Sequence, residues 1–163
     1  MLVMSNNMVQ LFFGWEAVGL VSYLLIGFWY TRPTAIFANM KAFLINRVGD
    51  FGFVLGIGLL FAYAGTMHYG EVFAQADKLA TMTLPGSDWM LLTVACICLF
   101  IGAMGKSAQV PLHAWLPDSM EGPTPISALI HAATMVTAGI FMVARFSPPV
   151  SYTHLRAHET KAN

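Results

Sequence analysis

Charged residues are scarce in this sequence. They make up 10% of the 163 residues, whereas a soluble domain carries roughly 25%. The 8 basic and 8 acidic residues cancel, which argues against a nucleic-acid-binding protein, because phosphate recognition needs clustered positive charge. A hydrophobic content of 57% also excludes a disordered chain. The composition therefore predicts an integral membrane protein in contact with the lipid bilayer.

Motifs for metals, nucleotides and redox cofactors are also lacking. Cys96 and Cys98 are two positions apart and face opposite sides of a helix, so we expect neither a disulfide nor a metal site from them. The triplet around Lys106 resembles the end of a phosphate-binding loop, but the first glycine of that motif is replaced by phenylalanine. We therefore expect no redox centre, cofactor or metal in this chain.

Long apolar segments are what the sequence does contain. A helix needs about 20 apolar residues to cross the hydrocarbon, and the segments 8–30, 35–63, 88–110 and 124–146 reach or approach that length. Within the second segment, Gly52-x-x-x-Gly56 predicts the close approach of a neighbouring helix. We predict an all-α fold, a polytopic transmembrane helical bundle fragment with about four spans.

The third span is predicted to be a discontinuous helix, broken near Lys106–Pro111. Glycines and prolines are dense between residues 102 and 125, and proline both removes a backbone donor and clashes with the preceding turn. Irregular backbone at membrane depth is tolerated only where it is buried in protein or lines a wet cavity. The break therefore marks a candidate functional region.

Ionisable residues inside the predicted spans are the candidate functional residues. A charge at the bilayer centre costs about 2.5–3.5 kcal/mol on insertion scales, so such residues pair with one another and mark ion or proton routes. Each also has a purely structural interpretation. Glu16 and His131 could simply be hydrogen-bonded in the core, Asp50 could form an internal ion pair with Arg47, and Lys106 could snorkel to the interface. The proton-transfer candidates are Glu16, Asp50, Lys106 and His131.

Three segments resemble the antiporter-like membrane subunits of respiratory complex I, and within them the NADH-quinone oxidoreductase subunit L (chain 5) family. They read GWEAVGLVSYLLIGFWY, MKAFLINRVGDFGF and GKSAQVPLHAWLPDSMEGPTPISALIHAATMVTAGIFMVAR. The resemblance implies a proton-translocating subunit of an oxidoreductase, driven by redox chemistry in other subunits. It places the family's glutamate, broken-helix lysine and histidine on Glu16, Lys106 and His131. The acidic residue of the family's VGD motif falls on Asp50, and in this interpretation Glu16 tunes the charge of Lys106.

The resemblance also implies partners and a location. NADH, FMN, iron–sulfur clusters and quinone would be bound by partner subunits and none by this chain. The partners would be the other membrane subunits of the complex, together with the lipid bilayer. The implied location is the inner (plasma) membrane of a bacterium, and the alternative is the mitochondrial inner membrane.

Two departures from the family shape the domain prediction. Family chains are several times longer and carry a second half-channel, so we interpret residues 1–148 as a partial translocating segment from an N-terminal half. Residues 149–163 form a polar tail unlike the family, which we expect to be disordered or to follow an artefactual sequence junction. Two other functions stay open: a subunit of a multi-subunit sodium/proton antiporter, and a structural membrane scaffold.

Overall fold

The protein is described by a computed structural model that covers residues 1–130, 135–151 and 153. Helices dominate, and no strand occurs among these residues, which confirms the all-α prediction. The longer helices are α1 (Met8–Ile26), α2 (Pro33–Ala64), α5 (Leu91–Lys106) and α7 (Met135–Arg145). The short elements are α3 (Tyr69–Ala74), α4 (Ala76–Ala80), the 3₁₀ helix η1 (Pro117–Glu121), α6 (Thr124–Ala128) and α8 (Ser147–Ser151).

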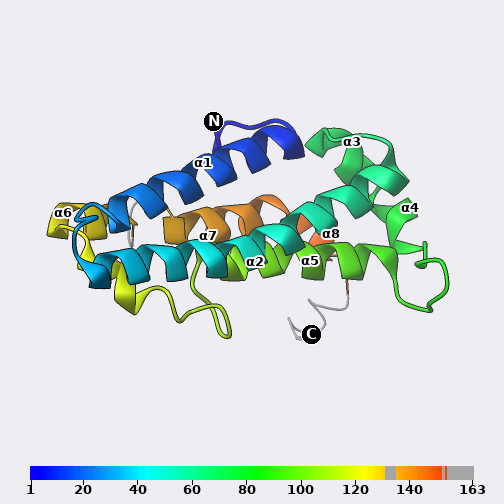
Figure 1. Ribbon diagram of the computed structural model, residues 1–163. Coiled ribbons are helices and arrows are strands. Elements are labelled where there is room, and N and C mark those ends of the chain that lie inside the picture. Colours follow the sequence, from blue (N-terminus) through cyan, green and yellow to red (C-terminus); the bar gives the residue numbers. More distant parts are fainter. Residues whose placement is uncertain (131–134, 152, 154–163) are drawn as a thin grey trace, which may run out of the picture.

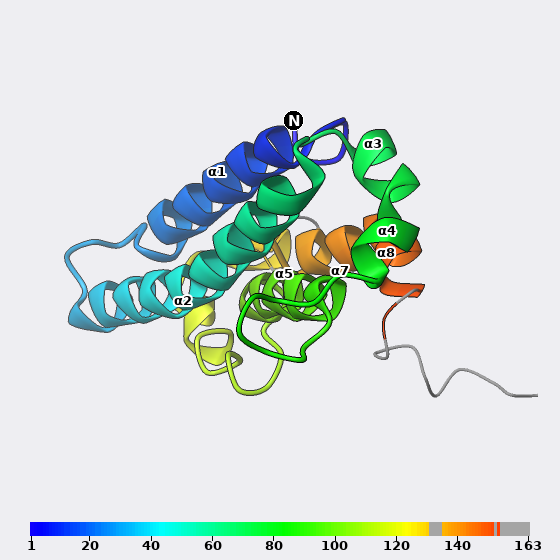
Figure 2. The same cartoon turned by 90° about the vertical axis from the view of Figure 1, so that its right-hand side faces the viewer.

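The longer helices run along one another and form an elongated bundle (Figure 1). The most extensive contact is between α2 and α5, while α1 packs on α2 and α7 packs on α5. Seen from the end, α1 and α2 lie side by side and α5 and α7 lie next to each other (Figure 2). The helices α3 and α4 lie at one end of the bundle and α6 lies at the other.

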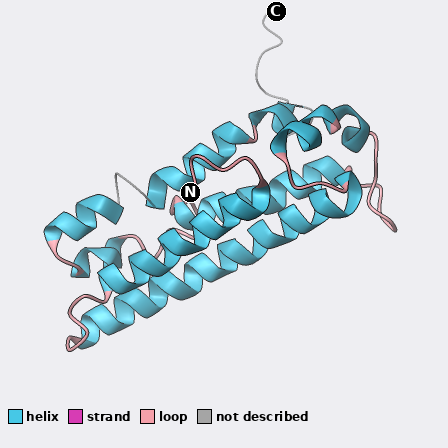
Figure 3. Cartoon of the chain, turned by 90° about the horizontal axis from the view of Figure 1, so that it is seen from above, coloured by secondary structure: helices cyan, strands magenta, loops and turns pink. Residues whose placement is uncertain are grey.

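Two helices of the described chain, α1 and α2, are long and apolar enough to cross a membrane by length and composition, and α5 and α7 are shorter apolar helices. Seen from above, the long helices extend along the length of the molecule (Figure 3). The 32 residues of α2 correspond to about 48 Å of helix, which exceeds the hydrocarbon thickness. The fourth predicted segment corresponds to α6 and α7, between which residues 131–134 lie outside the described chain.

Local sequence signals set the helix ends. The side chain of Asn7 accepts a 2.7 Å hydrogen bond from the Gln10 backbone N–H and so caps α1. Pro33 opens α2, where its missing N–H costs nothing because the first helical N–H groups have no partner. Gly65 ends α2 in the left-handed region at φ 70°, a conformation that glycine adopts without strain.

The contact between α2 and α5 depends on small residues. A Cβ atom on Gly52 would lie 2.8 Å from Cγ2 of Ile101, and one on Gly56 would lie 2.8 Å from Cγ of Leu99. Real Cβ atoms do not approach other atoms so closely, so only glycine fits at both positions. The predicted close approach is confirmed, and the neighbouring helix is α5.

The predicted break after Lys106 is confirmed. The α-helix ends at Lys106, the chain turns through residues 107–116, and it then forms η1 rather than a further turn of α-helix. At the other end of the sequence, the predicted domain boundary at residue 148 falls inside α8, where Pro149 is buried. Of the predicted tail, residues 152 and 154–163 lie outside the described chain.

Candidate functional site

Lys106 is buried at the broken end of α5. The side chain is 1% exposed, and its Nζ atom lies 3.4 Å from the Asp50 carboxylate on α2. The approach is possible because glycines precede both residues: a Cβ on Gly49 would lie 3.1 Å from Cα of Gly105. The interpretation of Lys106 as a snorkelling lysine is therefore wrong.

Asp50 receives hydrogen bonds or ion pairs from three helices. The indole Nε1 of Trp15 on α1 donates to Asp50 Oδ1 at 2.8 Å, and Arg47 on α2 places Nη1 3.6 Å from Oδ2. Trp15 is fully buried and stacks on Phe53 with ring centroids 4.7 Å apart, which fixes the direction of its N–H. Taking an ion out of water costs several kcal/mol, so these partners are what make a buried carboxylate tolerable here.

Arg47 extends the cluster to α1. Its guanidinium donates to the Glu16 carboxylate, and its Cζ also lies 4.7 Å from the centroid of the Phe43 ring. The predicted same-face pairing of Arg47 with Asp50 is confirmed. So is the inference that the partner of Glu16 must come from another helix.

We call Lys106, Asp50, Arg47 and Glu16 the charge chain. Their side chains alternate in sign and sum to zero, and they join α5, α2 and α1. The charge chain runs from a buried end at Lys106 to a partly exposed end, where the side chain of Arg47 is 36% exposed and that of Glu16 is 26% exposed. Opposite charges favour each other's ionised form, so a change of protonation at one end alters the field at the other.

The direct neighbour of Lys106 differs from the one that we expected. The sequence interpretation gave Glu16 the task of tuning Lys106, whereas the structure places Asp50 beside Lys106 and Arg47 beside Glu16. Glu16 is therefore not the ion-pair partner of Lys106, and Arg47 and Asp50 lie between them in the charge chain. His131, the remaining candidate, lies outside the described residues, and its role stays a prediction.

The irregular backbone after Lys106 is anchored by buried side chains, although residues 109–111, 113 and 114 are exposed. The indole Nε1 of Trp115, a fully buried side chain, donates to the Gly105 carbonyl at 3.1 Å. The hydroxyl of Ser107 donates to the Val136 carbonyl on α7 at 2.7 Å. The first contact satisfies a carbonyl at the end of α5, the second ties the start of the loop to α7, and together they hold Lys106 in place from the loop side.

A second ion pair joins α2 to η1. Nζ of Lys41 lies 2.6 Å from Asp118 Oδ2, and the hydroxyl of Thr34 donates to Glu121 Oε2 at 3.0 Å. Both side chains of the Lys41–Asp118 pair, which we call the outer pair, are about one-third exposed. The outer pair thus fixes the segment that follows the break.

Sequence reasoning missed Trp15 and Gly19 on α1 and Asn46 on α2. The first two share the buried face of α1, and their spacing of four residues was the available signal. Asn46 lies one helical turn before Asp50; its amide donates to the Ala42 carbonyl, and its buried Oδ1 is without a hydrogen-bond partner among the described residues. Such an acceptor is uncommon in a protein interior.

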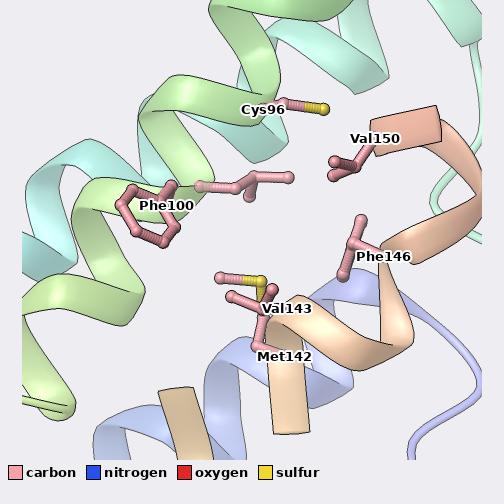
Figure 4. Close-up of a pocket in the computed structure, with 7 residues that line it drawn as sticks. Cys96, Phe100, Met142, Val143, Phe146 and Val150 are labelled. Carbon is pink, nitrogen blue, oxygen red and sulfur yellow. The ribbon is translucent and has the colours of Figure 1, made fainter. Parts of the chain in front are cut away.

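The apolar cavity between α5 and α7 is separate from the charge chain. It has a volume of about 310 Å³ and is lined by Cys96, Leu99 and Phe100 of α5 together with side chains of α7, of α8 and of Phe146 between them. Figure 4 shows these side chains converging from the three elements. Because its lining carries no charged side chain, this cavity is not the candidate proton-transfer site.

The sequence that forms this fold matches a known family of membrane proteins. The family model described as "NADH:quinone oxidoreductase/Mrp antiporter, TM" matches residues 5–160. This chain belongs to that family.

Curated relatives sharpen the resemblance. The chain is 71% identical over 152 residues to NADH-quinone oxidoreductase subunit L of Neisseria meningitidis, covering 91% of this chain and 23% of that protein. It is 57% identical over 155 residues to the subunit L of Rickettsia bellii, covering 94% of this chain and 24% of that protein. It is 56% identical over 160 residues to NADH-ubiquinone oxidoreductase chain 5 of Triticum aestivum, covering 94% of this chain and 23% of that protein. The chain thus spans about a quarter of the length of the curated relatives it matches.

A solved structure shows a similar fold. A chain of the Mrp complex from Dietzia sp. matches with a TM-score of 0.75 and 32% sequence identity, covering 90% of this chain and 15% of that chain. The helical arrangement of this chain is therefore shared with a chain of an Mrp complex.

Proposed function

We propose that this chain is a proton-translocating segment of a membrane subunit of NADH:quinone oxidoreductase. The observation that carries the proposal is the Lys106 ammonium, which is 1% exposed and lies 3.4 Å from Asp50 at the end of an apolar helix. Buried ionisable groups in membrane helices commonly mark proton routes. The identity of 71% to a subunit L supports the oxidoreductase branch of the family.

The geometry supports a mechanism in which Asp50 divides its interaction between two cations. Asp50 lies 3.4 Å from Lys106 and 3.6 Å from Arg47, and Arg47 also pairs with Glu16. When Glu16 is ionised it holds Arg47, and Asp50 stabilises the ammonium. When Glu16 is protonated, Arg47 turns to Asp50 and the ammonium loses its partner. Lys106 then releases its proton, which we propose is passed on by His131.

The proposal assigns the redox chemistry to other subunits. Among the described residues, no group of three or more His, Cys, Asp or Glu side chains is arranged to hold a metal ion. NADH, FMN, iron–sulfur clusters and quinone would be bound by partner subunits, and the neighbouring membrane subunits are the partners of this chain. Relatives from bacteria support a bacterial inner membrane as the location, and the plant chain 5 supports the mitochondrial alternative.

The test replaces Lys106 by alanine in the full-length parent subunit within its complex. We expect proton translocation into vesicles, followed with a pH-sensitive dye, to be suppressed, while the spectra of the redox centres stay unchanged. Lys78→Ala is the matched control, because Lys78 is an exposed lysine on α4, and it should leave translocation unaltered. Undiminished pumping in Lys106→Ala would refute the proposal.

The second candidate is a subunit of a multi-subunit sodium/proton antiporter. It is favoured by the match to the Mrp complex at a TM-score of 0.75. Transport by the parent complex separates the two functions: the oxidoreductase requires NADH and quinone, whereas an antiporter exchanges sodium for protons without either. Sodium-driven proton movement in the absence of NADH would favour the antiporter.

A further inference from the structure

The ammonium of Lys106 faces a position on α1 that has no side chain. A Cβ atom on Gly19 would lie 2.6 Å from Lys106 Nζ and 3.9 Å from Cε. Outside the backbone of α1 itself and the two chain neighbours of Gly19, no other atom of the described residues would come within 4 Å. The space beside Gly19 is thus occupied by the end of this lysine.

Two further groups define the position of the ammonium. Nζ lies 5.9 Å from the centroid of the Trp15 ring, which is one turn before Gly19 on α1, and 3.4 Å from Asp50 on α2. The ring face attracts a cation and the carboxylate pairs with it. Ser22 is one turn further along α1, and its hydroxyl already donates to the Gly19 carbonyl at 2.8 Å. Gly19 therefore provides space to the ammonium, while Trp15 and Asp50 provide attraction.

We propose that Gly19 is a positioning residue that seats the Lys106 ammonium between α1 and Asp50. A side chain at residue 19 would meet the far end of a flexible lysine rather than a backbone or a ring. The helices can therefore keep their packing while the ammonium moves away. We call the contact between residue 19 and the Lys106 ammonium the seat. Its effect on proton transfer rests on the proposed function, whereas the contact itself can be tested separately.

The first experiment compares Gly19→Ala with Gly58→Ala in the full-length subunit within its complex. Because a misplacement of about 1 Å in a reacting group can cost on the order of 100-fold in rate, we expect Gly19→Ala to lower proton translocation on the order of 10-fold or more. A Cβ on Gly58 of α2 would meet nothing within 4 Å among the described residues, so Gly58→Ala should leave translocation unchanged.

The second experiment is a double-mutant cycle between residues 19 and 106, read out as the unfolding temperature of the complex. A methionine at position 106 ends one atom short of Nζ, and its last carbon corresponds to Cε. That atom would lie 3.9 Å from the methyl group of an alanine at residue 19, an ordinary van der Waals distance. We expect Gly19→Ala to lower the unfolding temperature when residue 106 is lysine. In the Lys106→Met background this decrease should disappear, because alanine is by itself the better helix former.

The outcomes separate the seat from the proposed function. An equal effect of Gly19→Ala in both backgrounds would mean that Gly19 serves helix packing, which overturns the seat. Identical behaviour of Gly19→Ala and Gly58→Ala overturns it as well. If Lys106→Met pumps normally while the unfolding temperatures of the cycle are coupled, the seat stands as a structural contact and the proton-transfer function fails.

Discussion

Two ion pairs connect α2 to the region around the helix break, and they differ in burial. The Lys106–Asp50 pair is 1% and 5% exposed with a separation of 3.4 Å, whereas the outer pair is 32% and 36% exposed with a separation of 2.6 Å. The shorter pair is thus the one in contact with solvent. Distance alone would rank the outer pair as the stronger of the two.

Burial reverses that ranking. Two charges near a protein surface interact through a high effective dielectric, and exposed pairs contribute about 0.2–1 kcal/mol. Removing one partner of a buried pair instead leaves an uncompensated charge, which costs about 3–5 kcal/mol. We infer that the buried pair makes the charge of Lys106 depend on its neighbours, and that the outer pair contributes only to holding η1.

The largest expected effect comes from removing the carboxylate of the buried pair. Asp50→Leu in the full-length subunit leaves Lys106 without its anion and Trp15 without its acceptor, and should lower the free energy of unfolding by about 3–5 kcal/mol. Unfolding by denaturing detergent in mixed micelles measures the change. Adding Lys106→Met should recover most of the loss, because the unpaired charge is then gone. A double variant as unstable as Asp50→Leu would contradict this account of the buried pair.

The next effect isolates one hydrogen bond in the same cluster. Trp15→Phe keeps an aromatic ring to stack on Phe53 but removes the N–H that donates to Asp50 at 2.8 Å. A hydrogen bond to a charged group contributes about 1.5–3 kcal/mol, so we expect a loss of that size in the same unfolding titration. Trp89→Phe is the matched control, since Trp89 is 65% exposed. Equal losses for both variants would show that the Trp15 N–H contributes nothing specific.

The helices and the break after Lys106 could be predicted from sequence because they depend on local properties. The length of the apolar segments predicted the spans, and Gly52 and Gly56 predicted a close contact with another helix. The density of glycine and proline predicted the helix break. The identity of the facing helix was not predictable, since a GxxxG pattern does not specify its partner. Similarly, Arg47 and Asp50 could be paired because they are three residues apart on one helix.

The order of the charge chain required the structure. The sequence shows Glu16 as the lone acid of its segment, and nothing local indicates that Arg47 rather than Lys106 is its neighbour. That choice depends on the register between α1, α2 and α5, of which the approach of Gly49 to Gly105 concerns only α2 and α5. Trp15 was overlooked for the same reason, because its N–H acts through a contact 35 residues away.

The smallest expected effect concerns the outer pair and tests whether a partly exposed ion pair contributes less to stability than the buried Lys106–Asp50 pair. Lys41→Met removes a partly exposed charge and should lower the free energy of unfolding of the full-length subunit by about 0.2–1 kcal/mol. The loss should shrink as salt is added, because the Debye length falls from about 10 Å at 0.1 M to about 3 Å at 1 M ionic strength. The loss in Asp50→Leu should respond far less to salt, since buried pairs are screened much less. If Lys41→Met cost as much as Asp50→Leu and were insensitive to salt, burial would not be what distinguishes the two pairs.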